Sequence, residues 1–211
     1  MNVMIIPEDF RLDQFILQPI IAAMLAELGK PRAKVEVCRD PLLGGIDRAL
    51  DAAELAEIIA SRPMVDLFLL CVDRDLEHGR RAKLNHLETA LQPKVKKQGG
   101  IFLAENAWQE LEVWTIAGHD LLPGWQWTAI RAERDPKERY FEPLAQQRGV
   151  HGNDDGGRRI LGEAAARRYG RIYRLCREDV RVLHERVKSW VSGKGAPDWD
   201  TAFTASATGP R

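Results

Sequence analysis

The feature that most constrains the fold is an unbroken apolar segment, Leu67 to Val72, near the middle of the first half of the chain. Continuous apolarity over that length is typical of a central parallel strand covered by helices on both faces, because a strand with one face in water alternates apolar and polar residues. Three shorter segments also have strand character, at Asn2 to Ile6, Lys34 to Cys38 and Ile101 to Leu103.

Segments with helical periodicity or composition separate these strands. We expect helices over Leu12 to Leu28, Ile46 to Ala60 and Arg80 to Leu91. Strands that alternate with helices form right-handed crossovers and a parallel sheet. In the strand order 2-1-3-4, the first and third strands are neighbours. The predicted fold class is α/β, with a parallel sheet of about four strands, flanking helices and a helical Arg-rich C-terminal extension.

The domain organisation follows from changes in pattern along the chain. We expect an α/β domain over residues 1–121 and a mainly helical, basic extension over residues 122–191. The last helix of the extension, Glu178 to Val191, has one apolar face. Residues 192–211 mix small and polar residues without a period, which is typical of a disordered tail.

The composition excludes several classes of protein. The 211-residue chain is 45% hydrophobic and 29% charged, which excludes a mainly disordered chain. Its 3 cysteines lack the spacing of a zinc site or a disulfide framework. The longest apolar run, Ile20 to Ala26, is far shorter than the roughly 20 residues that a bilayer requires. We therefore expect a cytoplasmic protein that does not enter a membrane.

The equal numbers of basic and acidic residues, 31 of each, conceal an asymmetry. Acids predominate over residues 1–60, and arginines predominate over residues 156–191. This arrangement suits a metal site beside a surface that binds a polyanion, and a solvated helix face is the alternative for the arginines. The candidates for contacts with nucleic-acid phosphates are Lys96, Lys97, Arg167, Arg168, Arg171 and Arg174.

Three acidic residues follow two of the predicted strands. Asp73 and Asp75 come directly after the apolar strand, and Glu8 follows the first strand. If these strands are neighbours, the carboxylates meet at one edge of the sheet, where a cation would relieve their repulsion. Oxygen ligands of this kind are those that Mg²⁺ prefers. The alternative is that Asp73 caps a turn while the other two acids are solvated.

Four tryptophans lie close together after the fourth strand. They are Trp108, Trp114, Trp125 and Trp127. Such residues can stack on nucleobases, but a Trp-rich stretch between a sheet and helices is more often part of a core, which is the interpretation that we favour.

A strand that ends in Glu, a helix, and a later apolar strand that ends in Asp-x-Asp resemble the Toprim fold. Topoisomerases, bacterial primases, small maturation ribonucleases and OLD-type nucleases share that fold. The resemblance covers about residues 1–103. The segment from Ala104 to Gly118 and the later Asp135-Pro136-Lys137 are similar to elements of an uncharacterised bacterial Toprim-like family, whose relatives occur beside ATPase genes in phage-defence settings.

The resemblance implies roles for individual residues. Glu8 becomes a general acid/base or metal ligand, Asp73 and Asp75 become the metal-binding pair, and Glu112 is an additional acid near the same edge. Because Pro7-Glu8-Asp9-Phe10 replaces the usual Glu-Gly opening, either Glu8 or Asp9 can be the working carboxylate.

Two further positions are similar to family elements. Lys137 belongs to the Pro-Lys element. Asp13 matches the second acid of the first loop only loosely, and we interpret it as a residue at a helix N-terminus.

The implied function is Mg²⁺- or Mn²⁺-dependent hydrolysis of phosphodiester bonds in nucleic acid, DNA or RNA, in a setting such as phage defence. The alternative is a non-catalytic accessory subunit that docks on an ATPase or effector protein through the apolar face of Val180, Leu183 and Val187. A homodimer is compatible with both interpretations.

Overall fold

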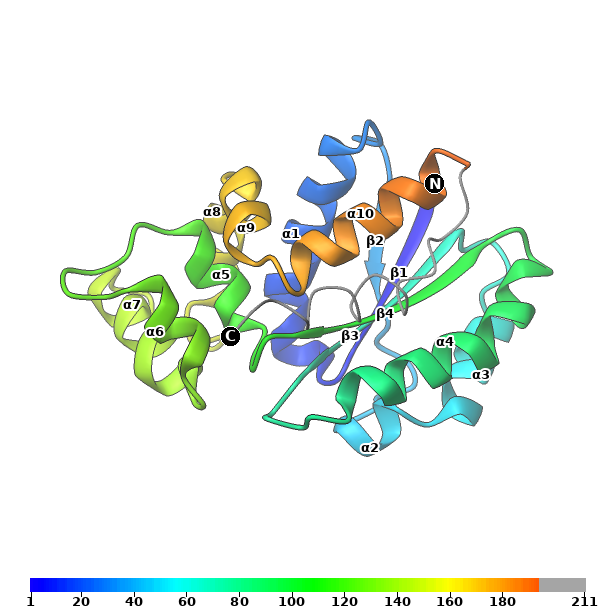
Figure 1. Ribbon diagram of the computed structural model, residues 1–211, viewed down its shortest axis with the longest axis horizontal. Helices are drawn as coiled ribbons and strands as arrows, with labels where there is room; N and C mark the ends of the chain where they lie inside the picture. The colour runs from blue at the N-terminus through cyan, green and yellow to red at the C-terminus, as the bar shows by residue number, and fades with distance from the viewer. Residues whose placement is uncertain (194–211) are drawn as a thin grey trace, which may run out of the picture.

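A parallel four-stranded sheet forms the centre of the computed structural model, which describes residues 1–193 (Figure 1). Its strands are β1 (Asn2–Pro7), β2 (Lys34–Val37), β3 (Leu67–Asp73) and β4 (Ile101–Ala107). They lie in the order β2-β1-β3-β4, and all three pairings are parallel. The predicted α/β fold class and strand order are confirmed.

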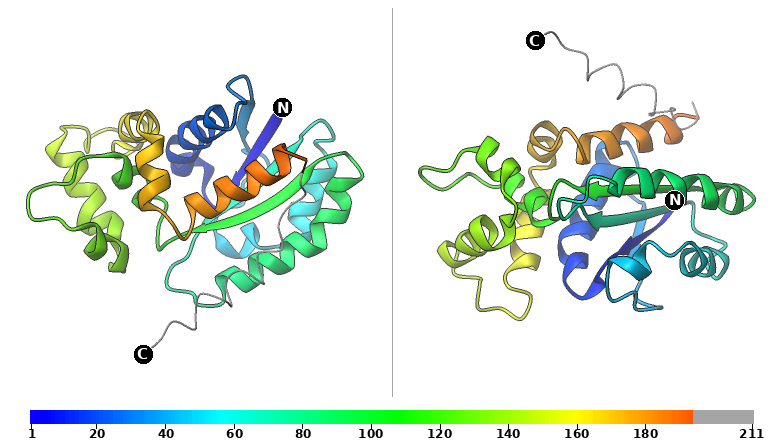
Figure 2. Two further views of the ribbon diagram at one scale, coloured as in Figure 1. Left: turned by 45° about the horizontal axis from the view of Figure 1, so that its top comes forward. Right: turned by 60° about the horizontal axis from the view of Figure 1, so that its bottom comes forward.

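Helices cover both faces of the sheet and form a lobe at one end of it (Figure 2). They are α1 (Phe10–Glu27), α2 (Ile46–Ala49), α3 (Ala52–Ala60), α4 (Arg80–Lys96), α5 (Glu112–Gly118), α6 (Trp127–Ala132), the π-helix η1 (Lys137–Phe141), α7 (Glu142–Gln147), α8 (Arg158–Ala166), α9 (Tyr169–Leu175) and α10 (Val180–Val191). Among residues 1–193, no helix combines the length and apolar character needed to span a bilayer.

The apolar run of β3 is unbroken because its side chains enter two cores. Leu67, Leu69 and Cys71 pack in one core with residues of α1, α9 and α10. Phe68 and Leu70 alternate with them and pack in the other core with residues of α3 and α4. Successive side chains of a strand point to opposite faces. In a strand covered on both faces every side chain is therefore buried, and every position favours an apolar residue.

Two elements differ from the sequence prediction. The single helix expected over residues 46–60 is divided into α2 and α3, because the side chain of Asp51 accepts hydrogen bonds from the backbone N–H groups of Ala53 (2.7 Å) and Glu54 (3.0 Å) and so begins a new helix. Strand β4 continues four residues beyond Leu103, and its polar residues Glu105 and Asn106 are buried.

The C-terminal helix α10 is part of the main core. Its apolar residues Val180, Leu183 and Val187 are buried in the cluster that contains alternate residues of β1, β3 and β4. The expectation that this face is open for docking on a partner is therefore wrong, because the chain's own sheet covers it. The core cluster at the sheet contains residues from both sides of the predicted boundary after residue 121, and residues 194–211 of the expected tail lie outside the described residues.

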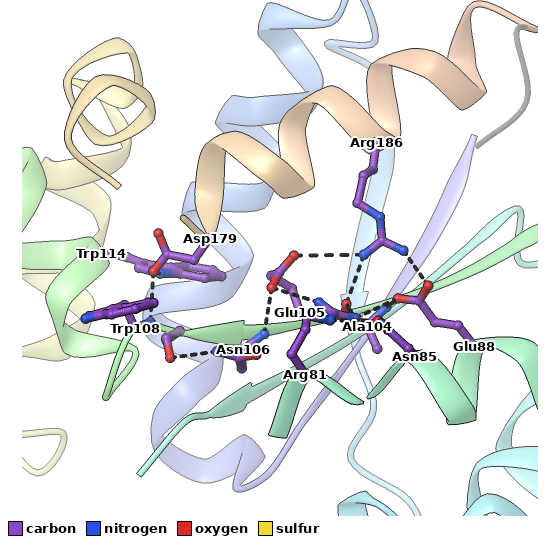
Figure 3. Close-up of polar contacts among 11 residues, drawn as sticks. Arg81, Asn85, Glu88, Ala104, Glu105, Asn106, Trp108, Trp114, Asp179 and Arg186 are labelled. Atoms are coloured by element: carbon purple, nitrogen blue, oxygen red, sulfur yellow. Dashed lines mark hydrogen bonds and ion pairs between the residues drawn. The ribbon is translucent and has the colours of Figure 1, made fainter. Parts of the chain in front are cut away.

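Two buried charged residues fasten α10 to the sheet (Figure 3). Asp179 Oδ2 accepts hydrogen bonds from the backbone N–H of Trp108 (2.9 Å) and the indole N–H of Trp114 (2.8 Å). Arg186 forms an ion pair with Glu88 and donates a hydrogen bond to the carbonyl oxygen of Ala104 (3.1 Å). Both contacts fix α10 against β4 and the segment that follows it.

Helix α8 approaches α1 closely at a glycine. A Cβ atom added to Gly162 would lie 2.2 Å from the carbonyl oxygen of Phe15, so a side chain of any size there requires the helices to separate. We expect Gly162→Ala to destabilise the fold by about 1–3 kcal/mol, the usual cost of overpacking. Urea denaturation followed by circular dichroism measures this change.

The matched control is Gly170→Ala in α9, where an added Cβ meets no atom within 4 Å. There the better helix propensity of Ala should leave the free energy of unfolding unchanged or raise it by up to about 1 kcal/mol. Equal effects of the two substitutions would contradict the close approach of α1 and α8.

Candidate functional site

The predicted acids lie at the carboxyl edge of the sheet, between β1 and β3. Pro7 of β1 pairs with Cys71 of β3, so Glu8 directly follows β1 at the level where β3 ends in Asp73. The connections from these two strands lead to opposite edges of the sheet, toward β2 and toward β4. Ligands of open α/β sheets bind at such a switch point.

Glu8 carries a carboxylate oxygen that is buried and without a hydrogen-bond partner, Oε2. Burial raises the pKa of this carboxyl group, and the nearby charge of Asp75 raises it further, while Arg80 and a backbone hydrogen bond from Ile46 oppose the shift. The side chain is therefore held in a setting that disfavours its own charge.

Burial and neighbouring carboxylates also disfavour the charged forms of Asp73 and Asp13. Asp73 Oδ1 accepts a hydrogen bond from the backbone N–H of Leu111 (2.8 Å), yet burial, Glu112 and Asp13 together raise its pKa well above the ordinary value. Asp13 lies in the first turn of α1, and Oδ2 accepts a hydrogen bond from the N–H of Asp9 (3.0 Å). Burial, with smaller effects of neighbouring acids, raises the pKa of Asp13 to about 7.

These side chains form one group, which we call the acidic cluster: Glu8, Asp13, Asp73, Asp75 and Glu112. Each of them either raises the pKa of another member or has its own pKa raised by one, which places them within electrostatic reach of one another. All three positions that the sequence singled out, Glu8, Asp73 and Asp75, belong to it.

Two arginines partly neutralise the acidic cluster. A guanidinium nitrogen of the buried Arg80 lies 3.8 Å from a carboxylate oxygen of Asp75. The Nε–H of Arg158, at the start of α8, donates a hydrogen bond to Oε1 of Glu112 (3.0 Å), and both of these side chains are buried. The remaining members, Glu8, Asp13 and Asp73, have no ion pair in the described part of the chain.

The loop that carries Asp75 has an unusual backbone. Asp75 (φ 50°), Leu76 (φ 58°) and Gln109 (φ 75°) all adopt the left-handed region without being glycine. Gln109 holds the loop, because its carbonyl oxygen accepts from the N–H of Arg74 (2.8 Å) and its side-chain oxygen accepts from the N–H of Leu76 (3.3 Å). Such conformations cost free energy and are concentrated at functional sites.

The donor atoms suit a hard divalent cation, but they are not arranged as a finished site. Within residues 1–193, no group of three or more His, Cys, Asp or Glu side chains lies close enough to hold a metal ion. The oxygen donors and the unpartnered Oε2 of Glu8 nevertheless fit Mg²⁺ or Mn²⁺, because a bound cation would satisfy that atom and offset the repulsion among the carboxylates.

Asp9 differs from Glu8 because its carboxylate is already hydrogen-bonded. Asp9 is the N-cap of α1, where its side chain accepts from the backbone N–H of Arg11 (3.0 Å), and the guanidinium of Arg11 lies 2.7 Å from its other oxygen. That hydrogen-bonded pair lowers the pKa of Asp9. Of the two neighbours, Glu8 is the one with an unused carboxylate oxygen.

Lys137 lies beside the acidic cluster, at the start of η1. Its backbone N–H donates to a carboxylate oxygen of Glu110 (2.8 Å), and its ammonium group lies 3.3 Å from Glu138. Burial lowers the pKa of Lys137, but Glu138 and Glu112 more than offset this effect, and the net pKa is raised. A permanent positive charge therefore stands near Glu112.

The structure places the basic candidates in two separate groups. Lys96 and Lys97 are exposed at the end of α4, where the chain turns into the amino end of β4, the edge opposite the acidic cluster. Arg168 and Arg171 lie 3.0 Å and 3.6 Å from the same carboxylate oxygen of Asp120. The last two candidates, Arg167 and Arg174, are exposed on either side of this pair.

The sequence prediction does not include four residues among those of the site: Asp13, Glu110, Arg80 and Arg158. Asp13 occupies the helix N-terminus that the sequence predicts for it, but its burial among the acids is a tertiary effect. Glu110 lies beside Lys137, and burial raises its pKa to about 7. The counter-charges Arg80 and Arg158 come from distant segments, and no local spacing marks them.

Comparisons with known proteins found no match for this chain among protein-family models, curated proteins or solved structures. The resemblance to the Toprim fold therefore depends on the order of strands and helices, the three acids and the two later segments, Ala104 to Gly118 and Asp135-Pro136-Lys137.

The raised pKa of Asp13 predicts a change of stability with pH. Its pKa is about 7 in the folded chain against an ordinary value of 3.8, so the folded state loses stability as the pH rises through that interval. Asp13→Asn keeps the hydrogen-bond acceptor without the charge. At pH 8 this variant should be more stable than the wild type by about 1–4 kcal/mol, and at pH 4 the difference should largely vanish.

Asp120→Asn is the control, because Arg168 lowers the pKa of Asp120 and so favours its charged form. This substitution should give no stabilisation at pH 8. Chemical denaturation of the three proteins at both pH values provides the comparison. A destabilisation by Asp13→Asn of equal size at pH 4 and pH 8 would show that Asp13 carries no charge penalty.

Proposed function

We propose that this protein is a divalent-cation-dependent phosphodiesterase that cleaves nucleic acid at the acidic cluster. The observation that carries the proposal is the convergence of carboxylates at the switch point between β1 and β3, with Oε2 of Glu8 buried and without a hydrogen-bond partner. An unpaired buried carboxylate is costly, and the cost is removed when a cation is bound beside it. The Toprim resemblance supports the same assignment.

Each member of the cluster has a part in this reaction. Glu8, Asp73 and Asp75 would hold the Mg²⁺ or Mn²⁺, and the bound ion would polarise the phosphate that is cleaved and stabilise the developing negative charge. Glu8 would also accept the proton of the attacking water, because its carboxylate lies at the same edge of the sheet as the metal-binding pair. Arg80 and Arg158 pair with Asp75 and Glu112 and fix the orientation of their carboxylates.

A second candidate function is that of a non-catalytic accessory subunit for an ATPase or effector protein. It is favoured by the lack, within residues 1–193, of a group of three potential ligands close enough to hold a metal ion. The pairing of Asp75 with Arg80 and of Glu112 with Arg158 points the same way, because an acid already paired needs no cation. In this case the docking surface lies elsewhere than on the buried face of α10.

Substitutions at the acidic cluster test the first function. With Mg²⁺ or Mn²⁺ present, we expect the wild type to cleave a fluorescent oligonucleotide. Glu8→Gln should lower the rate by about 10²- to 10⁴-fold, the contribution of a general base, while changing the Mn²⁺ affinity less. Asp73→Asn should weaken both cleavage and Mn²⁺ binding, measured by calorimetric titration.

Glu36→Gln serves as the control, because Glu36 is an exposed acid on β2 that forms an ion pair with Lys34. It should leave cleavage and metal affinity unchanged. A larger loss of activity from Asp9→Asn than from Glu8→Gln would move the role of the base to Asp9. Absence of Mn²⁺ binding and of cleavage in the wild type would leave the accessory subunit as the better account.

A further inference from the structure

A groove lined by tryptophans and arginines begins at Trp108, directly after β4 and so at the same edge of the sheet as Asp73, and the proposed cleavage reaction makes no use of it. The groove has a volume of about 460 Å³, and its walls include Trp108, Trp127, Arg131, Arg174 and Arg177. These residues come from three segments far apart in the sequence: the residue after β4, helix α6, and α9 with the loop that follows it. We call it the tryptophan groove.

The two tryptophans of the groove differ from the other two in the Trp-rich stretch. Trp114 is fully buried, and Trp125, which is partly exposed, packs edge-on against Tyr140 with 4.9 Å between ring centroids. Trp108 and Trp127 are also partly exposed, and they are the two that line the groove. The expectation that these tryptophans belong to the core therefore holds for Trp114 and does not extend to the whole stretch.

Both groove tryptophans are fixed through their polar edges. The indole N–H of Trp108 donates to the carbonyl oxygen of Arg131 (2.9 Å), and that of Trp127 donates to the carbonyl oxygen of Leu175 (3.2 Å). With the N–H groups satisfied by the backbone, the rings offer apolar, planar surface rather than hydrogen bonds. Planar surface of this kind is what stacks on nucleobases without regard to sequence.

The arginines of the groove are not equivalent. Arg131 is neutralised by Asp179 (3.1 Å) and Glu178 (2.7 Å), so it is a structural part of the wall. Arg174 and Arg177 are exposed and form no ion pair with other residues of the described chain. Two unpaired guanidinium groups beside partly exposed indole rings match the alternation of phosphate and base along a nucleic-acid strand.

Arg74 connects the groove to the acidic cluster. Its guanidinium carbon lies 4.1 Å from the centroid of the Trp108 ring, and the residue stands between Asp73 and Asp75 in the sequence. A planar guanidinium at this distance stacks on the Trp108 ring, so a base takes that place only when the exposed part of the Arg74 side chain moves aside. A strand with a base in that place lies next to Arg74 and therefore next to the loop that carries Asp73 and Asp75.

We propose that the tryptophan groove binds single-stranded nucleic acid, with unpaired bases stacked on Trp108 and Trp127 and phosphates on Arg174 and Arg177, and leads the strand to the acidic cluster. The last part of this inference rests on the proposed function, whereas the binding of the strand does not. The groove selects single strands because the bases of a duplex are stacked on each other and cannot reach an indole ring.

Anisotropy of fluorescein-labelled 12-nucleotide probes in EDTA tests the binding without cleavage. Oligo(dT) and oligo(U) distinguish DNA from RNA, and a duplex of the same length tests selection of single strands. We expect the wild type to bind a single strand more tightly than the duplex. Trp108→Leu should weaken that binding about fivefold or more, whereas Trp108→Phe, which also loses the indole N–H but keeps an aromatic face, should retain most of it.

The exposed arginines provide variants that should not disturb folding. In Arg174→Ala/Arg177→Ala, the slope of log affinity against log salt concentration should fall in magnitude by about 0.7 for each phosphate that the variant no longer binds. The matched control is Lys30→Ala/Arg32→Ala, which removes two exposed charges between α1 and β2, at the opposite edge of the sheet. Its slope and affinity should equal those of the wild type.

Duplex binding as tight as single-strand binding would overturn the inference, as would equal affinities of the Leu and Phe variants or an unchanged slope in the double arginine variant. Cleavage assays with Mg²⁺ or Mn²⁺ separate this result from the proposed function. Groove-dependent binding in a protein that cleaves nothing supports the groove and refutes the phosphodiesterase. Cleavage of single strands that is unaffected by all groove variants refutes the groove and supports the phosphodiesterase.

Discussion

The parallel pairing of β1 with β3 is the constraint on which the rest of the structure depends. Because β3 is apolar on both faces, it must lie between two strands and beneath two layers of helices, and β1 and β4 are its neighbours. In the resulting register, β1 ends close to Asp73 of β3, and Trp108 directly follows the end of β4. One edge of the sheet thus receives Glu8 and Asp73, the first turn of α1 with Asp13, and the tryptophan groove.

This edge is also where the fold stores unfavourable free energy. Burial and mutual repulsion raise the pKa of three carboxyl groups there, and two arginines neutralise only part of the charge. The left-handed backbone of Asp75 and Leu76, and of Gln109 in the segment after β4 that is hydrogen-bonded to them, adds strain at the same edge. Other buried charges form ion pairs, as Asp179 with Arg131 and Arg186 with Glu88, but Glu105 also has one oxygen without a hydrogen-bond partner and a pKa raised to about 7 by burial. Raised carboxyl pKa values and strained backbone at one edge of a sheet are typical of a ligand-binding site, and they do not stabilise the fold.

The sequence predicts the sheet and its order because the strands and helices differ in local periodicity, and it predicts Glu8, Asp73 and Asp75 because strand ends are local features. It does not predict contacts between distant segments. Arg158 meets Glu112 across 46 positions and Arg186 meets Glu88 across 98, so some arginines of the basic region form ion pairs inside the fold. From the sequence alone, this region is interpreted as a phosphate-binding or solvated surface. The apolar face of α10 is likewise visible as a pattern, but only the tertiary structure shows that the chain's own sheet covers it.

The central claim is that the acidic cluster is a cation site, and a crystal grown or soaked with millimolar Mn²⁺ tests it most directly. Anomalous scattering recorded near the manganese absorption edge locates the ion without reference to activity. The account predicts a peak at the carboxyl edge of the sheet, coordinated by Oε2 of Glu8 and by a carboxylate of Asp73 or Asp75. A map with no peak there, in which the ion pairs of Arg80 and Arg158 are unchanged, would contradict it.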